Sequence, residues 1–329
     1  PSAAGQFSWH LEGRDNTGAE FRTPVEAFNV EESRFQGYAR VDTNNFWFVF
    51  ENGDFFYPVI LNLRSPVDER SGYIGWTALP DERGGTYVMD RYIDKMAAAG
   101  ITVGRTWMMP AWGGLEWNRD WPGYHGLGFY NLQNAWRFDH LLDYAEQRNV
   151  LMEIVLDAHG PFTTQYDSQW DINPYNTRNG GPVRRHWQVM TDDKAKQLFK
   201  NRYRYIAARF GASPALFGWT MWIEANVVNQ NYTDLTSWHR GLCSYLKSID
   251  NGRHPISSEF NTAAGVPGVW ELAEIDYVQA PAYNFGEGLL STFRGSANDI
   301  QSYDKPIIIE EYGGHAQGGD ARWVSHEIH

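Results

Sequence analysis

The chain has 329 residues, of which 42% are hydrophobic and 21% charged, and its formal net charge is −12. This length suits a (β/α) barrel with additions, and the acidic balance argues against a nucleic-acid partner because phosphates would be repelled. No run of about 18 apolar residues occurs, so we expect no membrane partner.

The first 50 residues have the pattern of short β-strands, with brief apolar runs broken by Gly, Asp and Asn. Asn52-Gly53 lies between two aromatic runs and predicts a β-hairpin with a type I′ turn. Because a few strands alone make a poor domain, we expect the tail of a β-sandwich or a small sheet packed on the next domain. We assign residues 1–50 to this N-terminal β segment and residues 51–329 to that next domain.

From residue 56 onward, apolar runs of strand length alternate with helical patterns. The expected strands are Phe56–Asn62, Ile101–Met108, Leu151–Asp157, Phe217–Ile223, Pro255–Phe260, Tyr277–Ala282 and Ile307–Glu311. The expected helices are Tyr87–Ala99, Leu132–Arg148, Asp193–Phe210, Leu235–Ile249, Val269–Glu274 and a weaker one near Leu289–Ser302. This alternation predicts an α/β fold, a (β/α)8 TIM barrel. Seven strands are visible, so we expect that the chain is truncated after strand seven and lacks the eighth.

Aromatic residues make up 16% of the chain. Most such rings pack in the core of any protein, but the flat face of a tryptophan also suits the C–H face of a sugar. Trp112, Trp117, Trp121 and Trp170 lie in polar, loop-like contexts, so they are candidates for sugar contacts. The long loop over residues 157–192 is the clearest insertion, and loops of that length are usually functional.

Two glutamates follow apolar strand patterns at the point where each strand should end. Glu224 follows Phe217–Ile223, and Glu311 ends Ile307–Glu311. A barrel keeps its chemistry at the carboxyl ends of its strands, and a pair of carboxyl groups is what hydrolysis of a glycosidic bond requires. Glu310 and Glu311 are adjacent, so we expect their side chains on opposite faces of the strand, with only one facing the barrel mouth.

These two segments resemble clan A of the glycoside hydrolases, most closely family 5 and its relatives. There the acid/base glutamate ends strand four in a Trp-x-x-x-Asn-Glu pattern, and the nucleophile ends strand seven in a Pro-x-x-x-x-Glu-Tyr/Phe-Gly pattern. The resemblance covers roughly residues 38–315 and implies that Glu224 is the acid/base and that Glu311, rather than Glu310, is the nucleophile. Residues 1 to about 66 also resemble the Ig-like β-sandwich module that precedes such barrels in bacterial enzymes, beginning part-way through.

Further positions match the family residue by residue. Arg105 resembles the strand-two arginine that keeps the nucleophile ionised, since a guanidinium lowers the pKa of a nearby carboxyl. His159 resembles the strand-three histidine that lines the sugar site, and Tyr283 resembles the strand-six tyrosine that hydrogen-bonds the nucleophile. Glu259, at the end of strand five, is either a subsite contact or a plain surface acid.

The chain departs from the family pattern at two positions. Ile223 replaces the asparagine that contacts the sugar 2-hydroxyl, so Asn226 or a loop group has to replace that contact, or the substrate has no free 2-hydroxyl, or activity is weak. Pro281 replaces the histidine two residues before the tyrosine of strand six. These departures affect the identity of the sugar and leave both carboxyl groups in place.

We therefore predict a retaining glycosidase that cleaves β-glycosidic bonds of a poly- or oligosaccharide with Glu224 and Glu311. A catalytically weak or inactive carbohydrate-binding barrel is the main alternative, and an acidic barrel lyase is a third. No metal-ligand motif, phosphate loop or Gly-x-Ser-x-Gly occurs, so we expect neither a metal nor a cofactor. The resemblance to bacterial enzymes leads us to expect a bacterial protein that is secreted or periplasmic.

Overall fold

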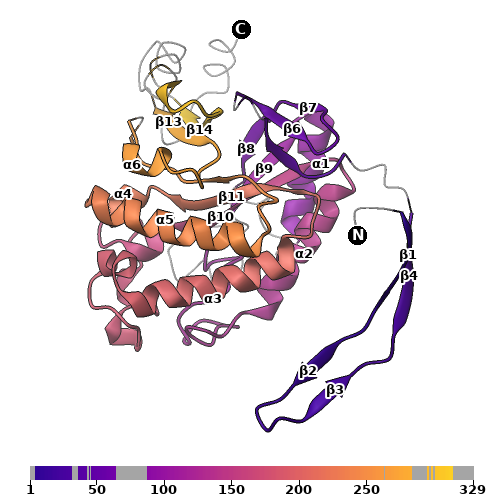
Figure 1. The fold of residues 1–329 in the computed structure, drawn as a ribbon. Coiled ribbons are helices and arrows are strands. Elements are labelled where there is room, and N and C mark those ends of the chain that lie inside the picture. The colour runs from indigo at the N-terminus through magenta and orange to yellow at the C-terminus, as the bar shows by residue number, and fades with distance from the viewer. Residues whose placement is uncertain are drawn as a thin grey trace. The chain divides into compact units, whose positions relative to one another are not determined.

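The computed structural model describes residues 4–31, 36–42, 44, 46–63, 87–262, 264–283, 295, 298 and 301–313 (Figure 1). It divides the chain into two compact units, residues 1–37 and residues 38–329. The second unit begins before residue 51, where the sequence pattern predicted the boundary. Most of the helix expected near 289–302 lies outside the described residues.

The first unit is an antiparallel ribbon. Strand β1 (Gly5–Trp9) pairs with β4 (Glu26–Val30), and β2 (Glu12–Arg14) pairs with β3 (Glu20–Arg22). None of residues 4–31 is buried. A β-sandwich needs two packed sheets around a core, so the Ig-like module is not confirmed by the part of this unit that the structure describes.

The second unit contains all seven strands expected for the barrel. Strands β8 (Ile60–Asn62), β9 (Val103–Trp107), β10 (Leu151–Ala158), β11 (Leu216–Ile223) and β12 (Ile256–Ser257) form one parallel sheet in the order β12-β11-β10-β9-β8. Strands β13 (Val278–Tyr283) and β14 (Ile307–Gly313) form a second parallel pair. The alternation of strands and helices therefore predicted the α/β class and the parallel strands correctly.

Single hydrogen bonds connect the two sheets into a ring. The amide of Asp276, just before β13, donates to the carbonyl of Ile256 in β12 at 2.8 Å. On the other side, the side-chain amide of Asn62 in β8 donates to the carbonyl of Glu310 in β14 at 2.8 Å. Within the described residues, strand seven thus contacts strand one directly, and no eighth strand is seen between them.

Helices cover the outside of this ring. They are α1 (Val88–Ala99), α2 (Leu132–Glu146), α3 (Asp193–Phe210), α4 (Ala225–Val228), α5 (Tyr232–Ile249) and α6 (Pro267–Trp270). Helices α2 and α3 begin at capping side chains, where Asn131 accepts from the Asn134 amide and Asp192 from the Ala195 amide. Asn231 caps α5 in the same way, so α5 begins at Tyr232, earlier than the apolar pattern predicted.

A small antiparallel sheet covers the amino-terminal end of the barrel. It consists of β5 (Ala39–Val41), β6 (Phe48–Phe50) and β7 (Phe55–Phe56). Phe48 packs its ring 5.1 Å from the ring of Phe217 and 5.5 Å from that of Tyr277, both inside the barrel. These strands thus pack on the amino-terminal end of the barrel, which leaves its carboxyl end for the site.

The hairpin between β6 and β7 is present, but its turn type was predicted wrongly. The Phe50 amide donates to the Asp54 carbonyl at 2.9 Å, and Gly53 has a φ of 90°. Asn52 does not have a positive φ, whereas a type I′ turn needs one at both central residues. The connection is a three-residue loop with glycine in the left-handed position.

Candidate active site

Glu224 and Glu311 lie at the carboxyl ends of their strands, as predicted. Glu224 directly follows β11, whose eight residues are all buried, and Glu311 lies near the end of β14. One layer inside the barrel is formed by Val103, Leu151, Phe217 and Ile308. Two residues further along three of these strands come Arg105, Glu153 and Glu310. All these strands therefore run in the same direction and end at the same rim.

The backbone of Glu224 is unusual. Its φ of 52° and ψ of 43° place it in the left-handed region, immediately before α4. A residue with a side chain adopts this region at a cost of about 1–2 kcal/mol, and such residues concentrate at functional sites. The turn leaves the carboxyl group a quarter exposed at the rim, with a side-chain exposure of 25%.

His159 links the two candidate carboxyl groups. Its Nδ1 lies 3.0 Å from Oε2 of Glu224, an ion-pair distance that does not meet hydrogen-bond geometry. Burial disfavours the charged imidazole, but the contact with Glu224 outweighs it and raises the pKa of His159, and the charge of Glu311 acts in the same direction. Glu224 and Glu311 therefore both act on the imidazole of His159.

Arg105 is buried in the barrel beneath Glu311 and contacts three glutamates. Its Nη2 donates to Glu259 at 2.9 Å, its Nε lies 3.7 Å from Glu153, and its Nη1 lies 3.9 Å from Oε1 of Glu311. Arg105, which matches the strand-two arginine, is therefore a cation beside the candidate nucleophile Glu311. The hydrogen bond, however, goes to Glu259, so Arg105 is shared and not dedicated to Glu311.

Glu259 is neither a surface acid nor a subsite contact. It is completely buried at the end of β12 and bonded to Arg105. Burial raises the pKa of Glu259 to about 8, with the nearby Glu311 adding to the effect and Arg105 opposing it. This burial could not be predicted from the sequence, because a single acid after a short strand is equally typical of a surface position.

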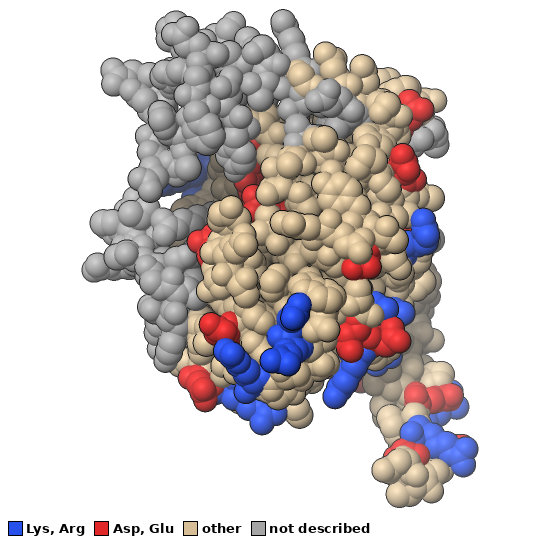
Figure 2. Space-filling view, turned by 90° about the vertical axis from the view of Figure 1, so that its left-hand side faces the viewer, with Lys and Arg blue, Asp and Glu red and all other residues tan. Residues whose placement is uncertain are grey.

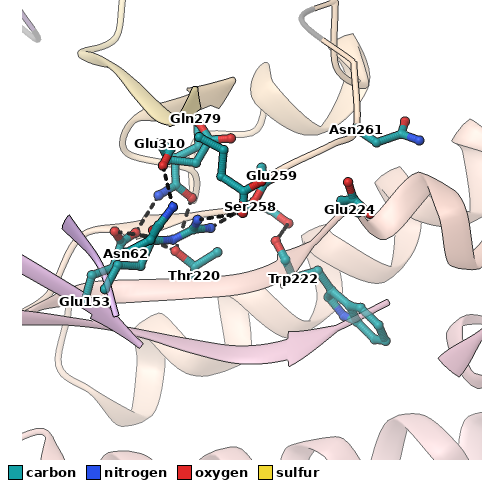
Figure 3. A network of polar contacts seen from close by, with 12 residues as sticks. Asn62, Glu153, Thr220, Trp222, Glu224, Ser258, Glu259, Asn261, Gln279 and Glu310 are labelled. Atoms are coloured by element: carbon teal, nitrogen blue, oxygen red, sulfur yellow. Dashed lines mark hydrogen bonds and ion pairs between the residues drawn. The ribbon is translucent and has the colours of Figure 1, made fainter. Parts of the chain in front are cut away.

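Glu153 is a further buried glutamate, and it is well supplied with donors. Its Oε1 accepts from the Tyr277 hydroxyl at 2.6 Å and the Gln279 amide at 2.6 Å, and the Thr220 hydroxyl lies 2.5 Å away (Figure 3). With Arg105 beside its other oxygen, these donors stabilise an ionised carboxylate. Glu153 was not among the predicted site residues. A glutamate inside an otherwise apolar run, in the strand Leu151–Ala158, was nevertheless a usable signal.

The expectation that Glu310 and Glu311 face opposite sides of β14 is wrong. Ala280 pairs with Ile309 and Ala282 pairs with Tyr312, so two steps along β13 match three steps along β14. This extra residue is a β-bulge, which breaks the alternation of side chains. Glu310 is buried and feels the charge of Arg105, while Glu311 also reaches Arg105.

The structure does not use Asn226 as a replacement for the missing asparagine. Its side-chain amide donates to Oδ1 of Asn261 at 2.6 Å and its own Oδ1 accepts from the Asn261 backbone at 3.0 Å. Asn226 is also only 9% exposed, so the pair fixes the loop after β12 against α4. Ile223 packs in an apolar cluster with Val155 and Ala158.

The tryptophans that were expected to contact sugar are buried. Trp112 and Trp170 belong to the main core, and Trp117 and Trp121 pack together in a smaller cluster. None of these four can offer an open ring face, so their assignment to substrate is corrected. Two partly exposed rings near the rim are better placed: Trp107 and Trp187.

Trp107 ends β9 two residues after Arg105, on the same strand face, and its ring lies 5.4 Å from the Arg105 guanidinium. It packs against the apolar cluster that contains Ile223. Trp187 lines a cavity of about 420 Å³ between the loops that follow β10 and β11, together with Gln165, His186 and Asn229. The loop over 157–192 is thus a packed wall beside Glu224, built of short 3-10 turns.

Tyr283 ends β13, where its backbone pairs with Gly313, and its side chain lies outside the described part of the structure.

In the described part of the chain, no group of three or more His, Cys, Asp or Glu side chains is arranged to hold a metal ion. No helix there is long and apolar enough to span a bilayer. On the face in Figure 2, basic and acidic side chains lie interspersed over the lower surface.

The chain is similar to mannan endo-1,4-β-mannosidases. It is 21% identical over 288 residues to enzyme A of Podospora anserina, covering 76% of this chain and 72% of that relative. It is 25% identical over 204 residues to enzyme F of Aspergillus clavatus, covering 54% of this chain and 44% of that relative. The chain thus spans less than half the length of the second relative. No family model matches the sequence.

Solved structures give the same fold. A candidate glycoside hydrolase from Bacteroides vulgatus has a TM-score of 0.62 at 15% identity, covering 98% of this chain and 56% of that one. A glycoside hydrolase family 5 mannosidase from Rhizomucor miehei has a TM-score of 0.60 at 16% identity, covering 86% and 74%. These similarities support a family 5-like barrel and a glycosidase.

Proposed function

We propose that the protein is a retaining β-glycosidase that cleaves β-mannosidic bonds in a poly- or oligosaccharide. The observation that carries this proposal is that both carboxyl groups lie at one rim among shared neighbours. Glu224 lies 3.0 Å from His159, and Glu311 lies 3.9 Å from Arg105, which donates to Glu259. The charges of Glu224 and Glu311 both act on His159 and on Glu259. Two carboxyl groups at one rim are the equipment of double displacement. The mannosidic linkage is proposed because the relatives are named as mannan endo-1,4-β-mannosidases.

In this mechanism Glu311 attacks the anomeric carbon while Glu224 protonates the leaving oxygen. Water then enters, Glu224 removes its proton, and the bond to Glu311 breaks, so the sugar leaves with its original configuration. Arg105 supports the ionised form of Glu311 from 3.9 Å. His159, 3.0 Å from Glu224, orients the acid/base group.

The direct test follows the anomer of the product by proton NMR during hydrolysis of β-1,4-mannan oligosaccharides. Retention supports double displacement, and a product of opposite configuration contradicts it. Glu224→Ala should lower turnover of an unactivated mannoside about 10²–10⁴-fold. Exposed Glu271, on the outside of the barrel, provides the matched control Glu271→Gln, which should keep the full rate.

A carbohydrate-binding barrel without catalysis is the second candidate. It is favoured by Ile223, which lies in an apolar cluster at the rim where the family has an amide that contacts the sugar. Under this alternative, mannan oligosaccharides bind the wild-type protein but are not hydrolysed, and Glu224→Ala binds them equally well. Measurable turnover by the wild-type protein that Glu224→Ala abolishes selects the glycosidase.

A further inference from the structure

The bulge in β14 places a third carboxyl group beside the proposed nucleophile. The bulge lies opposite Pro281, the residue between Ala280 and Ala282, which pair with β14 on either side of it. Proline has no N–H group and cannot donate to a strand ladder, so it is found in sheets mainly at edges and bulges. The departure at Pro281 therefore has a structural counterpart: Glu311 lies 3.9 Å from Arg105, and the adjacent Glu310 is buried where it feels the charge of the same arginine.

Glu310 has no hydrogen-bond donor among the described residues. The residue is 5% exposed, and neither carboxyl oxygen has a partner there, whereas its backbone carbonyl accepts from Asn62. In Figure 3 the side chains of Glu310 and Glu259 lie close to each other, and Glu310 is connected to the polar network through its backbone carbonyl. Oε1 of Glu259 also lacks a partner in that part of the chain. A buried carboxylate without donors is strongly destabilised, so one of these groups has to be neutral.

The distribution of donors indicates which of the buried glutamates keeps its proton to the highest pH. Glu153 accepts from two donors at 2.6 Å and lies beside Arg105, and Glu259 accepts from Arg105 at 2.9 Å. Of these three described glutamates, Glu310 alone has no such donor. Burial raises the pKa of Glu310 well above its ordinary value, and the charge of Glu259 adds to that effect, while Arg105 and the backbone N–H of Glu310 itself oppose it without cancelling it.

We propose that Glu310 is a neutral carboxylic acid and acts as a positioning residue, whose proton leaves Arg105 free to hold Glu259 and Glu311. This inference rests on the proposed function of Glu311. An ionised Glu310 would add a further negative charge against one guanidinium and draw it away from Glu311. The charged and titratable groups that face Glu310 or its network are Arg105, Glu153, Glu224, Glu259, Tyr277 and Glu311.

The kinetic test uses a dinitrophenyl β-mannoside. Its leaving group departs without a proton from Glu224, so the rate of the first step reports the attack by Glu311 and its support by Arg105. In the wild-type protein the rate should fall about tenfold for each pH unit above the titration of Glu310. Glu310→Gln, which keeps the neutral shape, should hold a flat rate over the same range, and Glu271→Gln should behave as wild type. A parallel fall in Glu310→Gln overturns the proposal.

A second readout does not depend on turnover. The infrared spectrum at neutral pH should contain a carbonyl band from a protonated buried carboxyl, which loses intensity in Glu310→Gln and keeps it in Glu271→Gln. An unchanged band in Glu310→Gln overturns the proposal. Loss of the band in a protein that hydrolyses no mannoside supports a neutral Glu310 and counts against the proposed function. If Glu310→Gln does not fold, both measurements are made on Glu310→Met, whose side chain has a similar length.

Discussion

Two buried arginines of the barrel domain have opposite surroundings. Arg202, on α3, donates to both oxygens of Asp157 at 2.5 and 2.7 Å, and the Tyr203 hydroxyl donates to the same carboxylate at 2.7 Å. Arg105 makes one hydrogen bond, to Glu259, and its other nitrogens lie 3.7 and 3.9 Å from two more glutamates. Arg202 bonds both oxygens of one carboxylate and has a second acid, Glu116, at 4.0 Å, whereas Arg105 bonds one oxygen and has three glutamates within 4.0 Å.

This difference separates a structural ion pair from a site that does chemistry. Hydrogen bonds from Nη2 of Arg202 to both oxygens of Asp157, with a third from Tyr203, hold this carboxylate in one position. A crowded cluster keeps carboxyl groups in different protonation states, which acid/base and nucleophilic chemistry require. Asp157 therefore attaches β10 to α3, whereas burial raises the pKa of Glu259 and of Glu310 beside the candidate nucleophile.

Removing the structural arginine should cost the most stability. Arg202→Ala leaves Asp157 buried without its cation, so we expect a loss of about 3–5 kcal/mol in the free energy of unfolding. Urea denaturation measures this loss, and turnover per folded molecule should stay close to wild type. Because Arg202→Met with Asp157→Asn removes both charges, the double variant should recover much of the stability. A loss of turnover without a loss of stability would contradict the comparison.

Changing the crowded arginine should instead affect catalysis. Arg105→Lys keeps a positive charge but loses the planar fork that reaches Glu259 and Glu311 together. We expect turnover to fall about 10²–10³-fold, the range found when one preorganised group at a reacting centre is removed. Turnover within about twofold of wild type in a folded Arg105→Lys protein would show that Arg105 does not support Glu311.

Glu259 should make stability depend on pH. Its pKa is raised to about 8 in the folded protein from an ordinary value of 4.5. The folded state therefore holds this proton between those values while the unfolded state releases it, so the stabilisation is present at low pH and is lost as pH rises through about 8. The slope is at most about 1.4 kcal/mol per pH unit. Urea denaturation of Glu259→Gln over this range should show a smaller slope, and an equal slope in both proteins would refute this assignment.

The smallest effect is expected far from both clusters, in the sheet at the amino-terminal end. Gly53 has a φ of 90° and no atoms lie near where its Cβ would be. Gly53→Ala should therefore cost about 1–2 kcal/mol from backbone strain alone, with unchanged kcat and KM. Thermal unfolding measures this cost, and a stabilised variant would mean that the turn adopts another conformation.

The sequence was sufficient for the barrel strands and for the two glutamates at their ends. Their signals are local: an apolar run specifies the strand, and the residue after it lies at the rim. The protonation state of Glu310, in contrast, could not be predicted from its neighbours in sequence. It depends on the register between β13 and β14, which a single strand sequence does not contain.

The roles of the tryptophans and of Asn226 also depended on distant contacts. Trp112 and Trp170 have polar neighbours in sequence but pack into a core that is assembled from several helices. Asn226 is paired with Asn261, which comes from the next strand-to-helix loop. The resemblance to family 5 assigned roles by position, and it could not show that Arg105 would be shared with Glu259.

The most direct measurement is to trap the glycosyl-enzyme with a 2-deoxy-2-fluoro β-mannosyl fluoride and to locate the label by peptide mass spectrometry. We predict one label, on Glu311, and no label in Glu311→Gln. A label on Glu310 or Glu259 in the wild-type protein, or labelling that persists at the same rate in Glu311→Gln, would contradict the assignment of Glu311 as the nucleophile.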